Sequence, residues 1–184
     1  HYGVHGTACI DTQTGKTLWS RQDLLCNHHR GAASSPILYG DLLILTFDGF
    51  DVQYVVALDK QTGATVWKTD RNIEYGTDNG DFKKAYCTPI VVEAGGRKQL
   101  ISPSSKAAVA YDPETGKELW RITYEGHSPA ARAAFGRFQL ERRVTRIGGQ
   151  HGVERDGHVD EFHGEAGAWA TAYRINKQGP FRAK

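Results

Sequence analysis

The sequence predicts an all-β protein built from short antiparallel strands. Three observations predict this class: one motif recurs three times, short apolar runs alternate with turn signals, and the 3.6-residue periodicity of a helix is absent. The motif reads D-x-x-T-G-x-x-x-W and begins at Asp11, Asp59 and Asp112, which gives spacings of 48 and 53 residues. Four shared identities in nine positions, found three times, indicate an internal structural repeat.

Each copy of the motif has the chemistry of a hairpin turn between two strands. The Asp side chain accepts hydrogen bonds from backbone groups two residues on, Thr does so more weakly, and Gly supplies the positive φ that such turns need. We therefore expect strands before the turns, over residues 6–10, 54–58 and 107–111, and after them, over residues 17–21, 65–69 and 118–123. The repeated residues are Asp11, Thr14, Gly15, Trp19, Asp59, Thr62, Gly63, Trp67, Asp112, Thr115, Gly116 and Trp120.

The Trp of each motif lies at a fixed distance from its turn and therefore always on the same face of its strand. A buried Trp removes about 200 Å² from water, which is worth roughly 5 kcal/mol at about 25 cal/mol per Å². We interpret the three Trp residues as contacts between repeat units rather than as a ligand site.

Two further strands precede the second and third turns. Residues 34–38 and 42–47 flank a turn at Gly40, and residues 88–92 and 99–102 flank a segment that contains Gly95. Four short antiparallel strands per repeat, with a turn signal after each, are typical of a β-propeller blade.

The predicted propeller is incomplete. The sequence holds a partial blade over residues 3–21 and whole blades over residues 34–69 and 86–123, and residues 128–135 are a candidate first strand of another blade. Propellers have four or more blades, so about two and a half would leave unpaired edges and exposed apolar faces. We expect the missing blades to come from a longer chain or from an oligomer.

The C-terminal tail does not match the rest of the chain. Val, Ile and Leu number 25 in residues 1–127 but six in residues 128–184, and Arg replaces Lys as the main basic residue. The repeat region is therefore assigned to residues 1–136, and residues 137–184 are expected to be an irregular tail. An out-of-frame or chimeric end would explain this change, and a genuine polar, loop-rich extension is the alternative.

The repeat resembles that of PQQ-like (quinoprotein-type) β-propellers, with Ala57 and Ala110 two places before the Asp and Cys9 as a departure in the first copy. The segments 27–31, 47–59 and 75–84 are also similar to bacterial PQQ-like repeat proteins of the kind found in planctomycetes. This resemblance covers residues 1 to about 136. It implies that each Trp stacks on the turn of the neighbouring blade, and that the protein is periplasmic or otherwise extracytoplasmic. WD40 propellers are excluded because no Asp follows the three Trp residues.

Composition excludes several classes of protein. A formal net charge of +2 argues against a nucleic-acid binder that relies on bulk charge. No apolar run approaches the roughly 18 to 20 residues that span a bilayer. Cys9, Cys26 and Cys87 are odd in number and form no CxxC pair, which indicates small semi-buried side chains rather than a disulfide framework.

Propeller topology groups the long connecting segments at one end of the blades, opposite the tight turns. Long loops on a rigid scaffold are where binding usually occurs, so this end is the candidate binding face. Its polar and aromatic residues are Asn27, His28, His29, Arg30, Asp48, Asp51, Arg71, Glu74, Tyr75, Asp78, Asn79 and Asp81.

Three groups of side chains have the composition of a metal site but not its spacing. Cys26 with His28 and His29 lacks a second ligand cluster, and Glu74 with Asp78 and Asp81 lacks the spacing of a calcium loop. The third group, in the tail, is His151, His158 and His163. No metal site, cofactor site or catalytic residue is predicted.

Three functions remain open. The leading one is a non-enzymatic binding or scaffold module with a protein, peptide or carbohydrate ligand on the long-loop face. The resemblance also implies a second, a PQQ-dependent dehydrogenase that uses calcium and oxidises an alcohol or sugar, although no catalytic residue of such enzymes is matched here. The third is a structural part of an envelope assembly whose Trp-lined edges are completed by other subunits.

Overall fold

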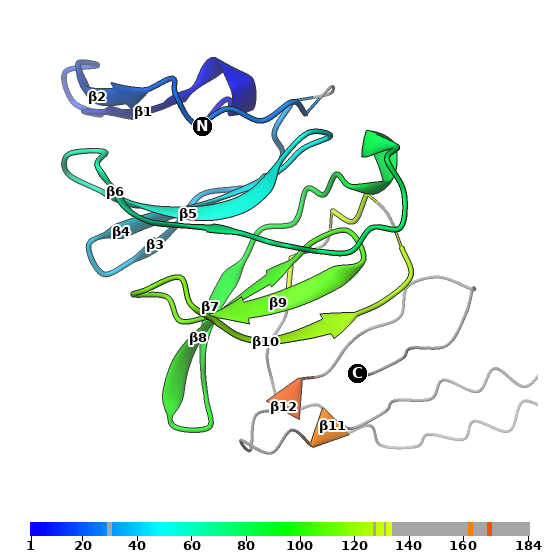
Figure 1. Cartoon of the computed structure of the whole chain (residues 1–184). Coiled ribbons are helices and arrows are strands. Elements are labelled where there is room, and N and C mark those ends of the chain that lie inside the picture. Colours follow the sequence, from blue (N-terminus) through cyan, green and yellow to red (C-terminus); the bar gives the residue numbers. More distant parts are fainter. Residues whose placement is uncertain (29–30, 127, 131, 134–161, 164–168, 171–184) are drawn as a thin grey trace, which may run out of the picture.

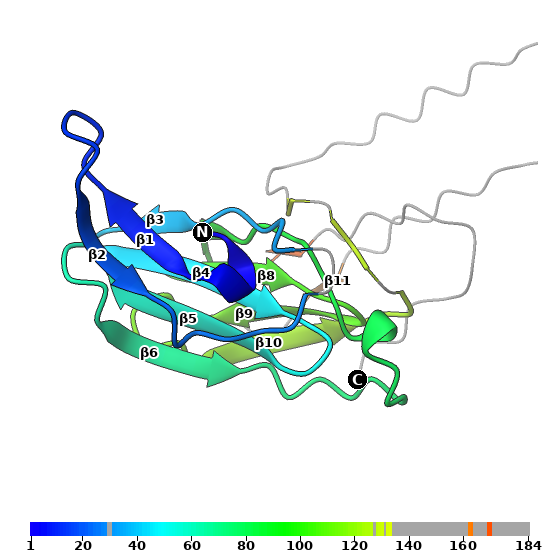
Figure 2. The same cartoon turned by 90° about the horizontal axis from the view of Figure 1, so that it is seen from above.

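The computed structural model describes residues 1–28, 31–126, 128–130, 132–133, 162–163 and 169–170. Within these residues the protein is an all-β, incomplete β-propeller: a two-stranded sheet and two four-stranded antiparallel sheets lie one against the next (Figure 1). Seen from above, the three sheets overlie one another (Figure 2).

The strands of each sheet pair in chain order, as in propeller blades. The first sheet contains β1 (Thr7–Ile10) and β2 (Thr17–Arg21). The second contains β3 (Ile37–Tyr39), β4 (Leu42–Asp48), β5 (Gln53–Asp59) and β6 (Thr65–Asp70). The third contains β7 (Ile90–Ala94), β8 (Arg97–Pro103), β9 (Ala107–Tyr111) and β10 (Glu118–Thr123). We call these the half blade, blade A and blade B.

Short elements complete the described structure. Two 3₁₀ turns, η1 (Gly3–His5) and η2 (Gly80–Phe82), lie outside the sheets. In the tail, β11 (Phe162–His163) pairs with β12 (Trp169–Ala170), and the rest of residues 137–184 lie outside the described part. Residues 128–130 and 132–133, expected to open another blade, form no strand. None of the helices in the described residues is long and apolar enough to cross a membrane.

The first strand of each whole blade starts later than the sequence predicts. β3 begins at Ile37 instead of residue 34, and β7 begins at Ile90 instead of residue 88. Pro36 and Pro89 precede these two starts, and Pro has no N–H to donate to a strand ladder. At the other end of β7, Gly95 and Gly96 both adopt positive φ (60° and 74°) and form a tight turn. Because this turn is short, β7 continues to Ala94 and β8 begins at Arg97, so both strands extend closer to the turn than predicted.

The three motif turns share the same backbone hydrogen bonds to the Asp residue. In the turn of blade A, the Asp59 Oδ1 atom accepts from the backbone N–H of Gln61 at 3.0 Å and of Thr62 at 2.7 Å. Gly63 then closes the turn with φ of 73°, and its N–H donates to the Asp59 carbonyl oxygen at 2.8 Å. Because all of these contacts are local, the motif alone specifies the turn.

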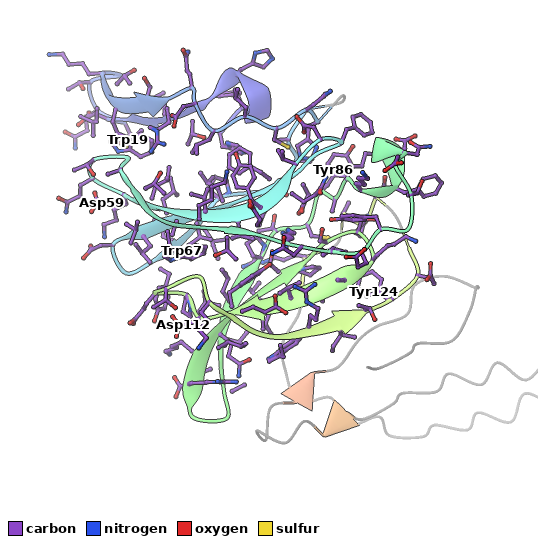
Figure 3. All side chains as sticks on the ribbon, viewed as in Figure 1. Trp19, Asp59, Trp67, Tyr86, Asp112 and Tyr124 are labelled. Carbon is purple, nitrogen blue, oxygen red and sulfur yellow. The ribbon has the colours of Figure 1, made fainter. Side chains whose placement is uncertain are left out.

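Each Trp of the first two motifs crosses to the turn of the next blade. Figure 3 shows Trp19 pointing toward the turn at Asp59 and Trp67 toward the turn at Asp112. The Trp19 Nε1 atom donates to the Lys60 carbonyl oxygen at 3.1 Å, and the Trp67 Nε1 atom donates to the Pro113 carbonyl oxygen at 3.1 Å. The Trp residues therefore join adjacent blades.

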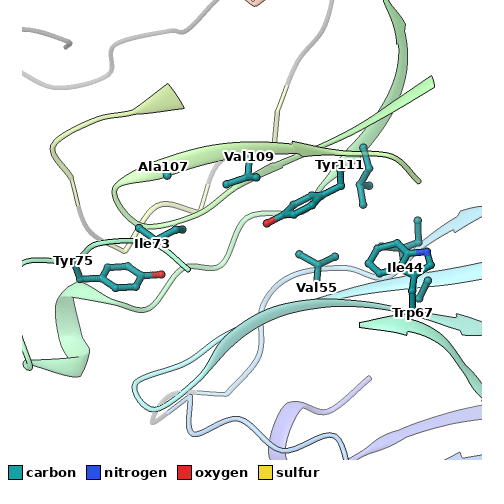
Figure 4. Close-up of a cluster of buried hydrophobic side chains, with 10 residues drawn as sticks. Ile44, Val55, Trp67, Ile73, Tyr75, Ala107, Val109 and Tyr111 are labelled. Atoms are coloured by element: carbon teal, nitrogen blue, oxygen red, sulfur yellow. The ribbon is translucent and has the colours of Figure 1, made fainter. Parts of the chain in front are cut away.

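The core lies between the blades. One buried cluster, which includes Leu24, Phe47, Tyr54 and Leu58, fills the space between the half blade and blade A. A second cluster lies between blades A and B, where Ile44, Val55 and Trp67 face Val109 and Tyr111 (Figure 4). Its remaining buried members are Ala57, Ile73, Tyr75, Leu100 and Ala107. Alternate residues of β5 serve the two clusters, as the period of a strand requires.

Candidate binding face

Three long segments meet at the end of the blades opposite the motif turns (Figure 1). The backbone N–H of Phe50, in the β4–β5 loop, donates to the Asn27 carbonyl oxygen at 2.8 Å. The Ser105 hydroxyl, between β8 and β9, donates to the Phe82 carbonyl oxygen at 2.5 Å. The first bond connects the β4–β5 loop to the segment before β3, and the second connects the β8–β9 turn to the β6–β7 connection.

The loops at this end pack closely against one another. A Cβ atom added at Gly49 would lie 2.4 Å from the Cys26 Sγ atom, and one added at Gly80 would lie 2.5 Å from the Phe50 ring. Asp51 accepts hydrogen bonds through Oδ1 from the backbone N–H of Asn27 at 2.9 Å and of Val52 at 2.8 Å. These contacts join the β4–β5 loop to the segment before β3 and to the β6–β7 connection.

The exposed part of this face is acidic. Glu74, Asp78 and Asp81 lie on the β6–β7 connection and Asp51 lies on the β4–β5 loop; all four are exposed. Asp81 forms an ion pair with Lys84, whose own side chain is largely buried. We define the acidic face as Asp51, Glu74, Asp78, Asn79 and Asp81.

Asp48 and Arg71 do not lie on this face, in contrast to the sequence-based expectation. Their side chains are 0% exposed and form an ion pair in which Arg71 Nε lies 2.6 Å from Asp48 Oδ1. The second guanidinium nitrogen, Nη2, donates to Asp48 Oδ2 at 2.8 Å and to the Ser102 hydroxyl at 2.8 Å. The Ser104 hydroxyl donates to Asp48 Oδ1 at 3.0 Å. Burial of these charges is tolerated because each is paired and hydrogen-bonded.

This buried pair links blade A to blade B, because Ser102 and Ser104 belong to blade B and its adjoining turn. Burial raises the pKa of the Asp48 carboxyl, and the Arg71 guanidinium opposes that shift by favouring the carboxylate. Sequence reasoning missed both serines. No spacing pattern connects Ser104 to Asp48, which lies 56 residues earlier.

Two other predicted surface residues are also buried. His28 is 2% exposed and packs its ring 5.3 Å, centroid to centroid, from that of Tyr86. Burial lowers the pKa of His28. Tyr75 is 8% exposed and belongs to the core between the blades, where burial raises its pKa to about 12. Both rings therefore serve packing.

Most of the remaining predicted residues lie outside the described part of the chain. His29, Arg30, His151 and His158 lie outside the described residues, and His163 is placed only as part of β11. Among the described residues, no three His, Cys, Asp or Glu side chains gather as metal ligands do. Cys26 and Cys87 are buried free thiols, and Cys9 is half-buried and free.

Comparison with known proteins places this geometry in a family. Residues 4–69 and 51–133 match the family model described as outer membrane protein assembly factor BamB. Over 136 residues the chain is 35% identical to a quinoprotein ethanol dehydrogenase of Pseudomonas aeruginosa, which covers 64% of this chain and 20% of the relative. It is 33% identical over 139 residues to a 1-butanol dehydrogenase (quinone) of Thauera butanivorans, with the same two shares. The chain thus spans about a fifth of the length of these relatives.

A solved structure shows the same fold. The quinohemoprotein alcohol dehydrogenase of Comamonas testosteroni matches with a TM-score of 0.51 at 15% identity, over 69% of this chain and 26% of that one.

Proposed function

This chain belongs to the PQQ-like β-propeller repeat family, and on that basis we propose that it is a non-enzymatic binding module. Its ligand is a protein, peptide or carbohydrate that sits on the acidic face. The family's description, which concerns outer-membrane protein assembly, supports a periplasmic or extracytoplasmic location.

The observation that carries this proposal is that the loop end has a buried ion pair and a separate exposed acidic surface. The charged side chains of Asp48 and Arg71 bind each other inside the protein. The exposed groups are carboxylates and an amide. They lie on two loops that contact each other where the Phe50 ring packs against Gly80. An acceptor-rich surface suits a partner that brings hydrogen-bond donors, such as a basic peptide or the hydroxyl groups of a sugar.

A binding screen tests the proposal. The labelled chain is applied to arrays of basic and neutral peptides and of glycans, and a specific ligand is expected. The variant Glu74→Gln/Asp78→Asn removes two exposed charges from the acidic face, and we expect it to weaken binding about tenfold. The matched control is Glu93→Gln/Glu114→Gln, which removes two exposed charges at the turn end of the blades. Equal binding by both variants would contradict the assigned face.

A PQQ-dependent alcohol dehydrogenase is the second candidate, favoured by the 35% identity to an ethanol dehydrogenase. The described residues do not by themselves suit an anionic quinone that carries carboxylates. The two buried cations at the loop end, Arg71 and Lys84, are both paired with carboxylates, and the exposed groups around them are mainly acidic. No step of such a reaction is therefore assigned to these residues.

The two candidates are separated by adding PQQ and Ca²⁺ to the full-length protein. Saturable binding of the cofactor together with dye-linked oxidation of ethanol or butanol would support the dehydrogenase and overturn the binding module. Absence of both, with ligand binding retained in the array, would support the binding module.

A further inference from the structure

His28 lies where three segments of the loop end meet. The residue before it, Asn27, donates its backbone N–H to Asp51 Oδ1 at 2.9 Å, and its carbonyl oxygen accepts from the Phe50 N–H at 2.8 Å. The His28 ring packs on the Tyr86 ring of the β6–β7 connection, with 5.3 Å between the ring centroids. Tyr86 lies at this end of the blades (Figure 3). His28 and Asn27 therefore join the segment before β3 to both loops that carry the acidic face.

The His28 side chain is buried with one of its ring nitrogens unpartnered. It is 2% exposed, and its Nδ1 atom has no hydrogen-bond partner among the residues that the structure describes. A neutral imidazole has one N–H, whereas both nitrogens of an imidazolium are donors that need acceptors. Burial of a charge costs far more than burial of a neutral polar group unless the charge is paired and hydrogen-bonded. The surroundings of His28 therefore suit the neutral ring.

One carboxylate and one ammonium act on His28 from the two neighbouring loops. Asp51 lies on the β4–β5 loop and is exposed. Lys84 lies on the β6–β7 connection, is 8% exposed and forms an ion pair with Asp81. Burial lowers the pKa of His28 below its ordinary value of 6.5; Asp51 opposes this shift, and Lys84 adds to it. A protonated His28 would be a second cation beside a buried one.

Two other titratable groups lie close to His28. The Cys26 thiol is on the same segment and is buried, and burial raises its pKa to about 12. The Tyr86 hydroxyl is buried and, like Nδ1 of His28, has no hydrogen-bond partner in the described part of the chain. Among these groups, only the exposed Asp51 carboxylate favours an imidazolium.

We propose that His28 is a pH-sensitive contact that closes the loop end when neutral and opens it when protonated. In the neutral form its ring holds the segment before β3 against Tyr86. Protonation places an unpartnered charge in that contact, so the segment separates from the β6–β7 connection and the hydrogen bonds of Asn27 to the β4–β5 loop are lost with it. The opening concerns the chain without any ligand and does not depend on the proposed binding function.

The direction of the pH effect follows from the preference of the open form for protons. A solvated His28 binds a proton near pH 6.5, whereas the buried ring binds one only at lower pH. The stability that the neutral ring provides is therefore complete above the ordinary pKa and is lost as the pH falls through the lowered pKa of the closed form.

Amide exchange with deuterium, followed by NMR on the ligand-free 184-residue chain from about pH 7.5 to about pH 5, tests this proposal. After correction for the intrinsic pH dependence of exchange, the Asn27 and Phe50 amides are expected to lose protection at least about tenfold as the pH falls. The Gly63 amide, which donates to the Asp59 carbonyl oxygen in a motif turn, is expected to keep its protection. The His28 ring resonances are expected to titrate over the same pH range as the loss of protection.

Three variants identify the group that titrates. His28→Phe keeps an aromatic ring against Tyr86 but cannot be protonated, so the protection of the Asn27 and Phe50 amides is expected to stay constant with pH. His28→Gln, which is also neutral at every pH, replaces it if His28→Phe does not fold. His5→Phe is the matched control, because His5 is exposed on η1 and its loss should leave the pH dependence of the wild type unchanged.

Two outcomes would overturn the proposal. One is a wild type whose Asn27 and Phe50 amides keep the same protection over the whole pH range. The other is an equal loss of protection in the wild type and in the non-titrating variant, which would assign the effect to another group.

Discussion

The ring of Trp67 lies against Gly116 of the neighbouring blade so closely that a Cβ atom on the glycine would come within 2.4 Å of its Cε3 atom. The same indole donates its N–H to the Pro113 carbonyl oxygen at 3.1 Å, and Thr69 donates to the Gly116 carbonyl oxygen at 2.8 Å. One turn thus provides a flat surface and two acceptors to the adjacent blade. The stability of the two-blade unit should depend strongly on this contact.

Replacing Trp67 by Ala removes the ring between blades A and B. We expect a loss of about 3 to 5 kcal/mol in the free energy of unfolding, as for other buried large-to-small changes. Denaturation in guanidinium, followed by circular dichroism, measures the loss. Val66→Ala is the control, because the adjacent Val66 is 52% exposed and should cost less than about 1 kcal/mol. A midpoint that hardly moves for Trp67→Ala would show that the ring does not join the blades.

Gly116→Ala and Gly15→Ala separate backbone strain from steric conflict. Both glycines have φ of 70°, so either substitution should cost about 1 to 2 kcal/mol in backbone strain. Only Gly116 has a ring against it, so Gly116→Ala should cost about 1 to 3 kcal/mol more. Chemical denaturation followed by circular dichroism measures both values. Equal losses would mean that Trp67 moves aside without cost.

A double-mutant cycle tests the buried ion pair. Arg71→Met and Asp48→Leu should each cost about 3 to 5 kcal/mol, because each leaves a buried charge without its partner. The double variant should be destabilised by much less than the sum, because it removes both charges. Chemical denaturation of the four proteins gives the coupling energy. Additive losses would show that the two charges do not depend on each other.

The motif turn at Asp59 should make stability sensitive to acid. The Thr62 backbone N–H and hydroxyl hold the pKa of Asp59 below its ordinary value of 3.8. The stability that this provides is present above the unfolded pKa and is lost as the pH falls through the lowered folded pKa. Asp59→Asn keeps an acceptor oxygen but does not titrate, so its denaturation midpoint should fall less steeply below about pH 4. Parallel curves for the two proteins would contradict the role of the carboxylate.

Thiol labelling should separate the three cysteines. Burial raises the pKa of Cys26 to about 12 and that of Cys87 to about 11, so both remain protonated near neutral pH. A thiol-specific reagent should therefore modify Cys9 first in the native protein and all three cysteines in denaturant. Cys9→Ser should abolish the fast phase. Fast labelling of two or more thiols in the native protein would contradict the described burial.

The repeat made the fold predictable because its chemistry is local. Asp59, Thr62 and Gly63 specify their turn through hydrogen bonds within five residues, so the sequence motif contains the whole structure of the turn. The strand starts were less predictable. β3 and β7 begin directly after Pro36 and Pro89, because Pro has no N–H to donate to a neighbouring strand. A prediction based on apolar residues alone does not take this missing donor into account.

The candidate site was less predictable because its contacts are distant in sequence. Asp48 is followed by a glycine-containing loop, so the sequence predicts an exposed carboxylate. Its partner Arg71 lies 23 residues later, and the two side chains pair in the interior. Ser102, a further partner of that guanidinium, lies 31 residues beyond Arg71. In contrast, Glu74 and Asp78 are exposed in the β6–β7 connection, as expected for carboxylates in a polar loop.

Trp19 and Trp67 each donate a hydrogen bond to the blade that follows their own. Trp19 reaches blade A, and Trp67 reaches blade B. The free energy of such an array is close to a sum of nearest-neighbour terms. Insertion or deletion of one whole repeat would therefore leave the remaining contacts unchanged, whereas a break inside a repeat would destroy two of them. The blade is the natural unit in which this chain can gain or lose sequence during evolution.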